Sequence, residues 1–306
     1  MTKIRHATDS VNAEAKKNAQ REHDPNGITI LRAVQPRGAQ LAKTYWRSGD
    51  GEIRKSAYSN AFAFEHHTGT ATDIRSLAAL LGILSACPDT AVIRAALRAD
   101  VPRTGADATD TDGAAVVRRL IHDRPNSPAT YEPAARGRRW ACLDLDALDV
   151  PAHLDPRTDP IECVRYARAH LPAPFRRATV AYQWSASMGA PTSSAPWARL
   201  KLHLWFWLRD PITDADLKVW ATSDPDAAGI DAALFNPVQV HYTATPIYGD
   251  GLHDPLCEHG IPRSGIVDGD RDDVDLAPTV SPYVERAERE RIEREALATA
   301  RQRERE

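Results

Sequence analysis

The sequence has few of the residues that would place it among disulfide-bonded or zinc-ribbon proteins. Its 306 residues contain only four cysteines, which are Cys87, Cys142, Cys163 and Cys257. They lie far apart and form no Cys-x-x-Cys pair, so neither a disulfide framework nor a four-cysteine zinc site is indicated, and we expect reduced thiols. His253 and His259 lie close to Cys257 in the chain, but a second cysteine pair at ligand spacing is missing, so they do not predict zinc.

Long apolar runs and an excess of one charge are missing too. No stretch reaches the roughly 18 apolar residues that a membrane span needs, and the N-terminal MTKIRHATDSVNAEAKKNAQ lacks the apolar centre of a signal peptide. We therefore expect a cytoplasmic protein. The formal net charge is −3, which gives no global basic field for nucleic acid. Binding to DNA or RNA would therefore have to come from a local patch.

What the chain does contain is 42% hydrophobic residues, enough for a sizeable core. Residues 1–27 are a polar arm that ends in the turn sequence DPNG. Residues 28–110 predict an accessory α/β unit, with strands in ITILRAV, AKTYWRS and RKSAYSNAFAF, a hairpin turn at SGDGE and a helical pair over 72–99. The loop RADVPRTGADATDTDG that follows is where we place the boundary with the next domain.

Residues 111–275 predict the main domain, because strands alternate with single helices in a way that is typical of α/β or α+β sheets. We expect strands in RRWACLDLDAL, ATVAYQWSAS and RLKLHLWFWL, helices in PIECVRYARAHL and TDADLKVWA, and an extended end in NPVQVHYTATPIY. Residues 276–306 form a charged tail, an Arg/Glu helix with too few apolar residues to bury a face. We expect it to be a linker or a lead-in to a partner domain.

The strand LKLHLWFWL, residues 200–208, carries two cationic side chains in an apolar run. Alternation places its leucines and phenylalanine on one face and Lys201, His203, Trp205 and Trp207 on the other. An ammonium group is rarely buried without a partner, so the pattern predicts an anion beside Lys201 and His203. A histidine satisfied within the core and an edge-strand lysine that blocks aggregation remain the alternatives.

Three aspartates are candidates for metal ligands. Asp144 and Asp146 point to the same face of a predicted strand, and a divalent cation such as Mg²⁺ or Mn²⁺ would resolve their mutual repulsion. Asp231 would complete a site for two metal ions if the fold brought it beside the first two. A strand-borne DxD also occurs in sugar-nucleotide transferases and phosphatases and at solvated strand ends, and Asp231 taken alone is an ordinary aspartate.

Donors that a triphosphate needs are gathered upstream of His203. Ser185 and Ser187 share a predicted strand face, Gly189 opens a loop, and Arg199 precedes Lys201. Phosphate oxygens need several N–H and O–H partners together with positive charge, so these residues predict a polyphosphate site.

The order of these features resembles the archaeo-eukaryotic primase superfamily, the primase-polymerases. The resemblance lies in the strand-borne Asp144 and Asp146, then Lys201 and His203 on a hydrophobic strand, then Asp231 after a small turn. It covers roughly residues 138–254 and is most similar to primase domains of phages, prophages and plasmids, which are often fused ahead of a helicase. The chain departs from relatives that have serine at the position of Lys201. It also lacks the Arg near a Pro-Gly that some plasmid relatives place after the third Asp, and has Gln239, His241 and Tyr242 in that region.

The resemblance implies an α+β fold in which an RRM-like antiparallel sheet packs beside a smaller N-terminal unit, with the active site between them. It implies template-directed nucleotidyl transfer by a DNA primase-polymerase, with a single-stranded DNA template and primer, NTP or dNTP as substrate, and a helicase domain or partner. By position, Asp144, Asp146 and Asp231 would bind two Mg²⁺ or Mn²⁺ ions. His203 would contact the nucleotide phosphates, and the further phosphate candidates are Lys201, Ser185, Ser187 and Arg199. Tyr242 is a possible template or nucleotide contact.

Two other functions fit parts of the pattern. A metal-dependent sugar-nucleotide transferase would also use DxD, but the chain has no early βαβ unit with a glycine fingerprint. A non-catalytic replication initiator would bind DNA through an RRM-like sheet. In either DNA-binding case we expect the basic cluster Arg136, Arg138 and Arg139 to help hold the nucleic acid, with salt-sensitive affinity.

Overall fold

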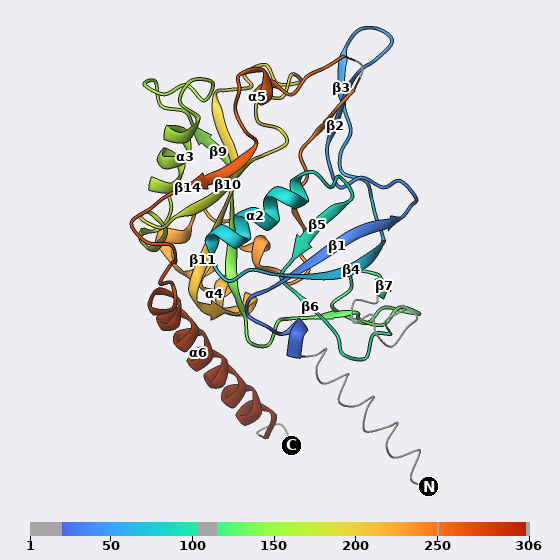
Figure 1. Cartoon of the computed structure of the whole chain (residues 1–306). Coiled ribbons are helices and arrows are strands. Elements are labelled where there is room, and N and C mark those ends of the chain that lie inside the picture. The colour runs from blue at the N-terminus through green and yellow to red at the C-terminus, as the bar shows by residue number, and fades with distance from the viewer. Residues whose placement is uncertain (1–19, 103–114, 250, 304–306) are drawn as a thin grey trace.

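The computed structural model describes residues 20–102, 115–249 and 251–303, and these form a mixed α+β fold built on antiparallel sheets (Figure 1). The α+β class expected from the sequence is therefore confirmed. None of the helices in the described part of the chain combines the length and the apolar character that crossing a membrane would require.

A four-stranded sheet carries the strands that the sequence analysis singled out. Its order is β14-β10-β11-β9, with every neighbouring pair antiparallel. Because β11 lies between β9 and β10, those two strands are parallel and form a split βαβ unit with helix α3. The elements of this part are β9 (Arg138–Asp149), α3 (Pro160–Ala169), β10 (Val180–Trp184), β11 (Arg199–Ile212), α4 (Asp214–Ser223) and β14 (Ser264–Val267).

A five-stranded sheet of order β12-β5-β1-β4-β7 holds the N-terminal strands, and two small sheets flank it. Residues from far along the chain complete these sheets: β12 pairs with β5, and β13 pairs with β2. The expected N-terminal and main domains are therefore interleaved. The strands are β1 (Gly27–Gln35), β2 (Thr44–Arg47), β3 (Ile53–Lys55), β4 (Ala63–Thr70), β5 (Thr90–Ile93), β6 (Ala96–Leu97), β7 (Ala115–Val117), β8 (Tyr131–Glu132), β12 (His241–Tyr242) and β13 (Ile247–Tyr248).

Helix α2 (Ile74–Ser85) explains why one face of β11 is so aromatic. The helix begins with a capping box in which the Asp73 carboxylate accepts from the Ser76 amide. Its buried apolar residues pack against Trp205 and Trp207, and also against Trp140 of β9. The opposite face of the four-stranded sheet packs against α3 and α4. The predicted face of β11 that carries Lys201, His203, Trp205 and Trp207 is thus divided, because α2 covers only the half with the two tryptophans.

The C-terminal helix α6 (Ala277–Arg303) packs against α4 at its beginning and then extends away from the body of the protein (Figure 1). Val280 is its one buried residue within the described part of the chain. This confirms a charged helix with almost no buried face, and its bounds lie within the expected tail, residues 276–306. The short helices η1 (Ala173–Phe175), η2 (Pro225–Ala227), η3 (Ala232–Phe235) and α5 (Pro255–Glu258) lie in connections.

The prediction of a second helix within residues 72–99 is wrong. The segment AVIRAALRA forms strands β5 and β6 instead, and all four residues of β5 are buried between β1 and β12. The position of β5 inside the sheet, where it is buried on both faces, overrides the helix preference of the alanines and of Leu97 in this segment. The expected strand RKSAYSNAFAF is divided into β3 and β4, while the loop at 103–114 lies outside the described residues.

The end of the polar arm docks on β4. The side chain of Glu22 is buried, and one carboxylate oxygen lies 3.1 Å from His66 Nε2 and 3.1 Å from the Thr68 hydroxyl, which donates to it. The arm up to residue 19 lies outside the described residues.

Candidate active site

A polar cleft of about 250 Å³ opens where the two large sheets meet. Segments from both parts of the chain line it: the connections before β2 and after β3, the middle of β9, the loop after β10, β11, η3 and the region of β12. The lining residues are Lys43, Tyr58, Cys142, Asp144, Asp146, Ser185, Ser187, His203, Leu234, Gln239, Val240, His241 and Tyr242. Six of the predicted site residues are therefore brought together here, namely Asp144, Asp146, Ser185, Ser187, His203 and Tyr242.

The two carboxylates of the DxD motif lie on β9 beside β11. Asp144 is directly opposite His203 in the strand register, and Asp144 Oδ1 lies 3.5 Å from His203 Nε2. That distance allows an ion pair, yet Asp144 Oδ1 and His203 Nδ1 are both buried without a hydrogen-bond partner in the described structure. Buried polar atoms of this kind usually have a partner, so these two atoms could each accept a contact from a ligand or an ion.

Electrostatics around Asp144 favour a cation. Burial raises the pKa of the Asp144 carboxyl above its usual range, and the negative charges of Asp146 and Asp231 add to the rise, while His203 and Lys43 oppose it. A divalent cation would offset both the desolvation and the repulsion between the carboxylates. Asp231 is thus close enough for its charge to act on Asp144.

Asp231 is nevertheless not positioned to share a metal ion with Asp144 and Asp146. It is exposed, it caps η3 by accepting from the Ala233 amide at 2.8 Å, and it is not among the residues that line the cleft. Within 20–102, 115–249 and 251–303, no three His, Cys, Asp or Glu side chains are close enough together to hold a metal ion as they stand. Asp144 and Asp146 are the carboxylates that the cleft itself presents.

The serine loop after β10 is held rigidly from two sides. The Ser185 and Ser187 hydroxyls lie 3.0 Å apart, and their loop is fixed by Tyr45, whose hydroxyl donates to the Ala186 carbonyl at 2.9 Å. Arg263, buried and paired with Asp254, donates to the Ser185 carbonyl at 2.8 Å. The two hydroxyls are therefore positioned at the cleft and not free to rearrange.

The two other cationic candidates, Lys201 and Arg199, are not among the residues that line the cleft. Lys201 is partly buried on β11, is not a lining residue, and carries a charge that acts on Lys43. Arg199 lies at the exposed start of β11, where it donates to the Asp149 carboxylate at 3.0 Å. Arg199 is therefore engaged in a surface ion pair outside the cleft.

One arginine of the basic cluster expected to help hold nucleic acid is buried. Arg138 is buried and donates to the carbonyls of Asp24, Arg94 and Ala95. Burial also lowers the pKa of Arg138 to about 10. This side chain joins the two sheets, so it is not available for a phosphate backbone, whereas Arg136 is exposed.

Lys43 and Tyr58 are among the lining residues that sequence reasoning missed. The Tyr58 ring stacks on Tyr242, with centroids 3.5 Å apart and planes 5° apart, and Lys43 Nζ lies 5.4 Å from the centre of the Tyr58 ring. No local pattern marks either residue, because both reach the site only through long-range strand pairing. Tyr242 is held by this stack at the wall of the cleft.

His241 lies behind the site between two tryptophans, with ring centroids 5.8 Å from Trp140 and 5.6 Å from Trp205. Burial, helped by the charges of His203 and Arg94, lowers the pKa of His241 to about 3. The unfolded chain binds this proton near its ordinary pKa of about 6.5. Stability that is present above about pH 6.5 is therefore lost as the pH falls towards 3, by at most about 1.4 kcal/mol per pH unit.

We expect His241→Phe to weaken this acid sensitivity, because phenylalanine keeps the packing and cannot bind a proton. The measurement is the urea unfolding free energy at several pH values between 7 and 4, compared between wild type and variant. His67→Phe is the control, since His67 is exposed on β4 and should leave the slope unchanged. Equal slopes for wild type and His241→Phe would contradict the assignment.

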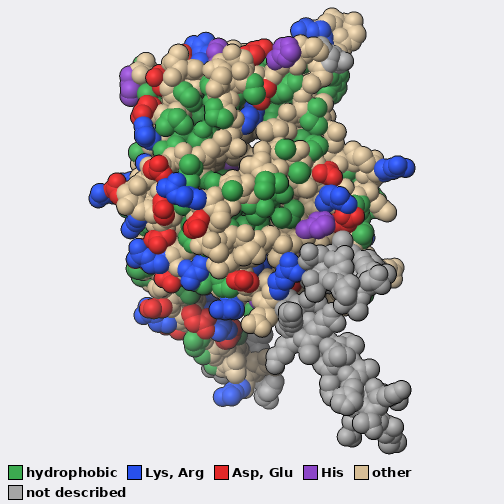
Figure 2. Space-filling view, in the orientation of Figure 1, with side chains coloured by type: hydrophobic (Ala, Val, Ile, Leu, Met, Phe, Trp, Pro, Cys, Tyr) green, Lys and Arg blue, Asp and Glu red, His purple; other side chains and the backbone are tan. Residues whose placement is uncertain are grey.

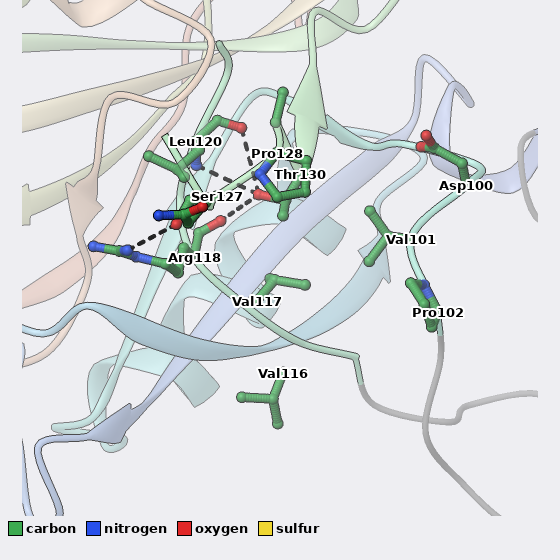
Figure 3. A pocket seen from close by; sticks show the side chains of 12 residues that line it. Asp100, Val101, Pro102, Val116, Val117, Arg118, Leu120, Ser127, Pro128 and Thr130 are labelled. Atoms are coloured by element: carbon green, nitrogen blue, oxygen red, sulfur yellow. Dashed lines mark hydrogen bonds between the residues drawn. The ribbon is translucent and has the colours of Figure 1, made fainter. Parts of the chain in front are cut away.

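A larger hollow, of about 480 Å³, lies beside β7 and is lined mostly by apolar side chains such as Val101, Val116 and Val117 (Figure 3). Its polar groups bond to one another: the Arg118 guanidinium donates to the Ser127 hydroxyl at 3.1 Å, as the dashed line shows. It borders both ends of the 103–114 segment, which lies outside the described residues, and it presents no carboxylate pair. We therefore place the site in the smaller, polar cleft.

Comparison of the chain with protein-family models, with curated proteins and with solved structures gave no match. The functional argument consequently depends on the geometry of the cleft itself.

Proposed function

We propose that the protein is a DNA primase-polymerase that joins nucleotides on a single-stranded template, with its active site in the polar cleft. The observation that carries the proposal is the facing pair of Asp144 and His203, with Asp146 and two serine hydroxyls in the same cleft. Carboxylates for metal and cationic or hydroxyl donors for phosphate are the two groups that nucleotidyl transfer needs side by side. The split βαβ unit of the four-stranded sheet also agrees with the RRM-like core that the resemblance implies.

The donor set fits a divalent cation in type and charge. Asp144 and Asp146 would hold it, because they supply hard oxygen ligands and Asp144 Oδ1 is buried without a partner. When bound, Mg²⁺ or Mn²⁺ would supply positive charge that activates the attacking 3′-hydroxyl and stabilises the departing pyrophosphate. The second ion of the two-metal hypothesis would need Asp231 to turn towards the cleft.

The remaining side chains act on the phosphates. His203 Nε2 lies beside the carboxylate and can donate to a phosphate oxygen, which would orient the triphosphate at the metal site. The hydroxyls of Ser185 and Ser187 supply further donors from a loop that is already fixed, so little conformational entropy is lost when the nucleotide binds.

We expect the template to be held by a limited set of contacts. Figure 2 shows that, among the residues it describes, acidic and basic side chains are intermixed on the face drawn and form no continuous basic surface. A net charge of −3 points the same way. We therefore expect modest affinity for single-stranded DNA that falls steeply with added salt.

The direct test is incorporation of labelled nucleotides, with Mn²⁺ or Mg²⁺, on a primed and an unprimed single-stranded template. Product on the unprimed template indicates priming, and product on the primed one alone indicates extension. The same mixtures with a panel of sugar nucleotides test the sugar-nucleotide transferase alternative, because that enzyme would consume them without a template. DNA binding with no incorporation under either metal would support the replication initiator and contradict the proposal.

We expect His203→Gln to raise KM for the nucleotide and to lower kcat, reducing kcat/KM by about ten- to hundredfold, the usual worth of a hydrogen bond to a charged group. Binding of single-stranded DNA should change little. His153→Gln, at an exposed histidine of a connection, is the matched control. Loss of folding in His203→Gln, with no separate kinetic effect, would indicate a core histidine instead.

A further inference from the structure

Lys43 lies where the two parts of the molecule join. Its backbone carbonyl accepts a hydrogen bond from the Ile247 amide at 2.8 Å, directly before β2 pairs with β13. Two residues later, the buried side chain of Tyr45 bonds to the carbonyl of Ala186, which is the residue between the two serines of the cleft. The backbone at Lys43 is therefore held in a fixed position relative to the serine loop.

The side chain of Lys43 lacks an ionic partner. It is half-buried in the wall of the cleft, and among the described residues its ammonium makes neither a hydrogen bond nor an ion pair, only the contact with the Tyr58 ring. Burial and the charges of Lys55 and Lys201 lower the pKa of Lys43, against the opposing effect of Asp146. A half-buried ammonium close to two like charges is costly unless an anion joins it.

The neighbouring carboxylates do not supply that anion. Asp144 and Asp146 act on Lys43 electrostatically without pairing with it. A metal ion bound to the two carboxylates would also neutralise part of their negative charge. An anion that pairs with the Lys43 ammonium must therefore belong to a bound ligand. At about 250 Å³ and with a polar lining, the cleft has room for phosphate groups.

We infer that Lys43 is a phosphate ligand of the cleft and that, with His203 and the serine loop, it binds the polyphosphate of a nucleoside triphosphate. The inference rests on the proposed function for the identity of the nucleotide. It assigns the N-terminal part of the chain a direct role, since one wall of the nucleotide site would come from the segment before β2. A sugar nucleotide carries a related diphosphate, so the test must separate the two sources.

The test is isothermal titration of the full chain, in Mn²⁺, with a sugar nucleotide for comparison and with two triphosphate probes, inorganic tripolyphosphate and a non-hydrolysable nucleoside triphosphate. We expect Lys43→Ala to weaken both by about ten- to hundredfold, and Lys43→Arg to retain most of the affinity because the charge is kept. Lys218→Ala is the matched control: it removes the same charge from the exposed side of α4 and should change affinity by less than about twofold. Melting temperatures identify any variant that fails to fold, and Lys43→Gln then replaces Lys43→Ala.

The outcomes separate this inference from the proposed function. If the wild type incorporates nucleotides and Lys43→Ala binds and uses triphosphate as the wild type does, the inference is wrong and the proposed function stands. If the wild type binds triphosphate through Lys43 but never polymerises, the inference stands and the proposed function is wrong. Binding of sugar nucleotides in preference to triphosphates would reassign the ligand and overturn both, as would a wild type that binds neither probe.

Discussion

Replacing Asp144 with Asn should abolish nucleotide incorporation, with a loss of about 10³-fold or more. The several kcal/mol that a catalytic metal supplies correspond to this factor, because each 1.4 kcal/mol or so is tenfold in rate. The protein should remain folded and is expected to be at least as stable, because the variant removes a partly buried charge whose pKa is raised by burial and by Asp146. The measurement pairs labelled-nucleotide incorporation with urea unfolding of the same preparations.

The matched control for this prediction lies on the same strand. Asp149→Asn makes the same chemical change at the exposed end of β9, where the carboxylate only accepts from Arg199. An exposed ion pair contributes about 0–1 kcal/mol, so this variant should retain full activity. Activity that survives in Asp144→Asn, or is lost equally in both variants, would refute the role of Asp144 at the metal site.

Replacing Arg94 with Met should produce the largest loss of stability in the chain, about 3–5 kcal/mol. Arg94 is fully enclosed after β5, where it pairs with Asp214 at the start of α4 and donates to the carbonyls of Trp140 and Ile212. Removing one partner of a buried pair leaves the other charge without compensation. The loss should appear as a lower free energy of urea unfolding.

A double-mutant cycle identifies the source of this loss. Arg94→Met combined with Asp214→Leu removes both charges, so the double variant should recover part of the stability that each single variant loses. Arg199→Met, which breaks only the surface pair with Asp149, should cost less than about 1 kcal/mol. If the Arg94 and Arg199 variants lose similar amounts, the buried pair does not contribute as described.

The elements that sequence analysis predicted correctly are those whose pattern is local. The alternation in residues 200–208 assigned both faces of β11, and the first helix of the pair expected over 72–99 forms directly after Asp73. The failure at AVIRAALRA has the opposite cause, because a segment rich in helix formers became a strand only through its buried place between β1 and β12. Tertiary contacts of this kind leave no mark on a short stretch of sequence.

The site was predictable in its residue types but not in its geometry. The sequence predicted that the DxD and the histidine belong to one site, and the structure places them in one cleft, but their direct opposition in the strand register follows from the pairing of β9 and β11, which the sequence does not specify. Lys43 and Tyr58 went unnoticed for the same reason. Arg138 was assigned to the surface because it belongs to a basic run, yet its guanidinium satisfies three buried carbonyls.

The return of β12 and β13 to the N-terminal sheets has a consequence for how the chain can be assembled. Thr44 pairs with Ile247, so roughly two hundred intervening residues must be synthesised and arranged before this contact forms. Such distant pairing slows folding and joins the halves into one cooperative unit. A fragment cut between residues 110 and 111 would leave sheet edges without their partners, so neither half is expected to be an autonomous folding module.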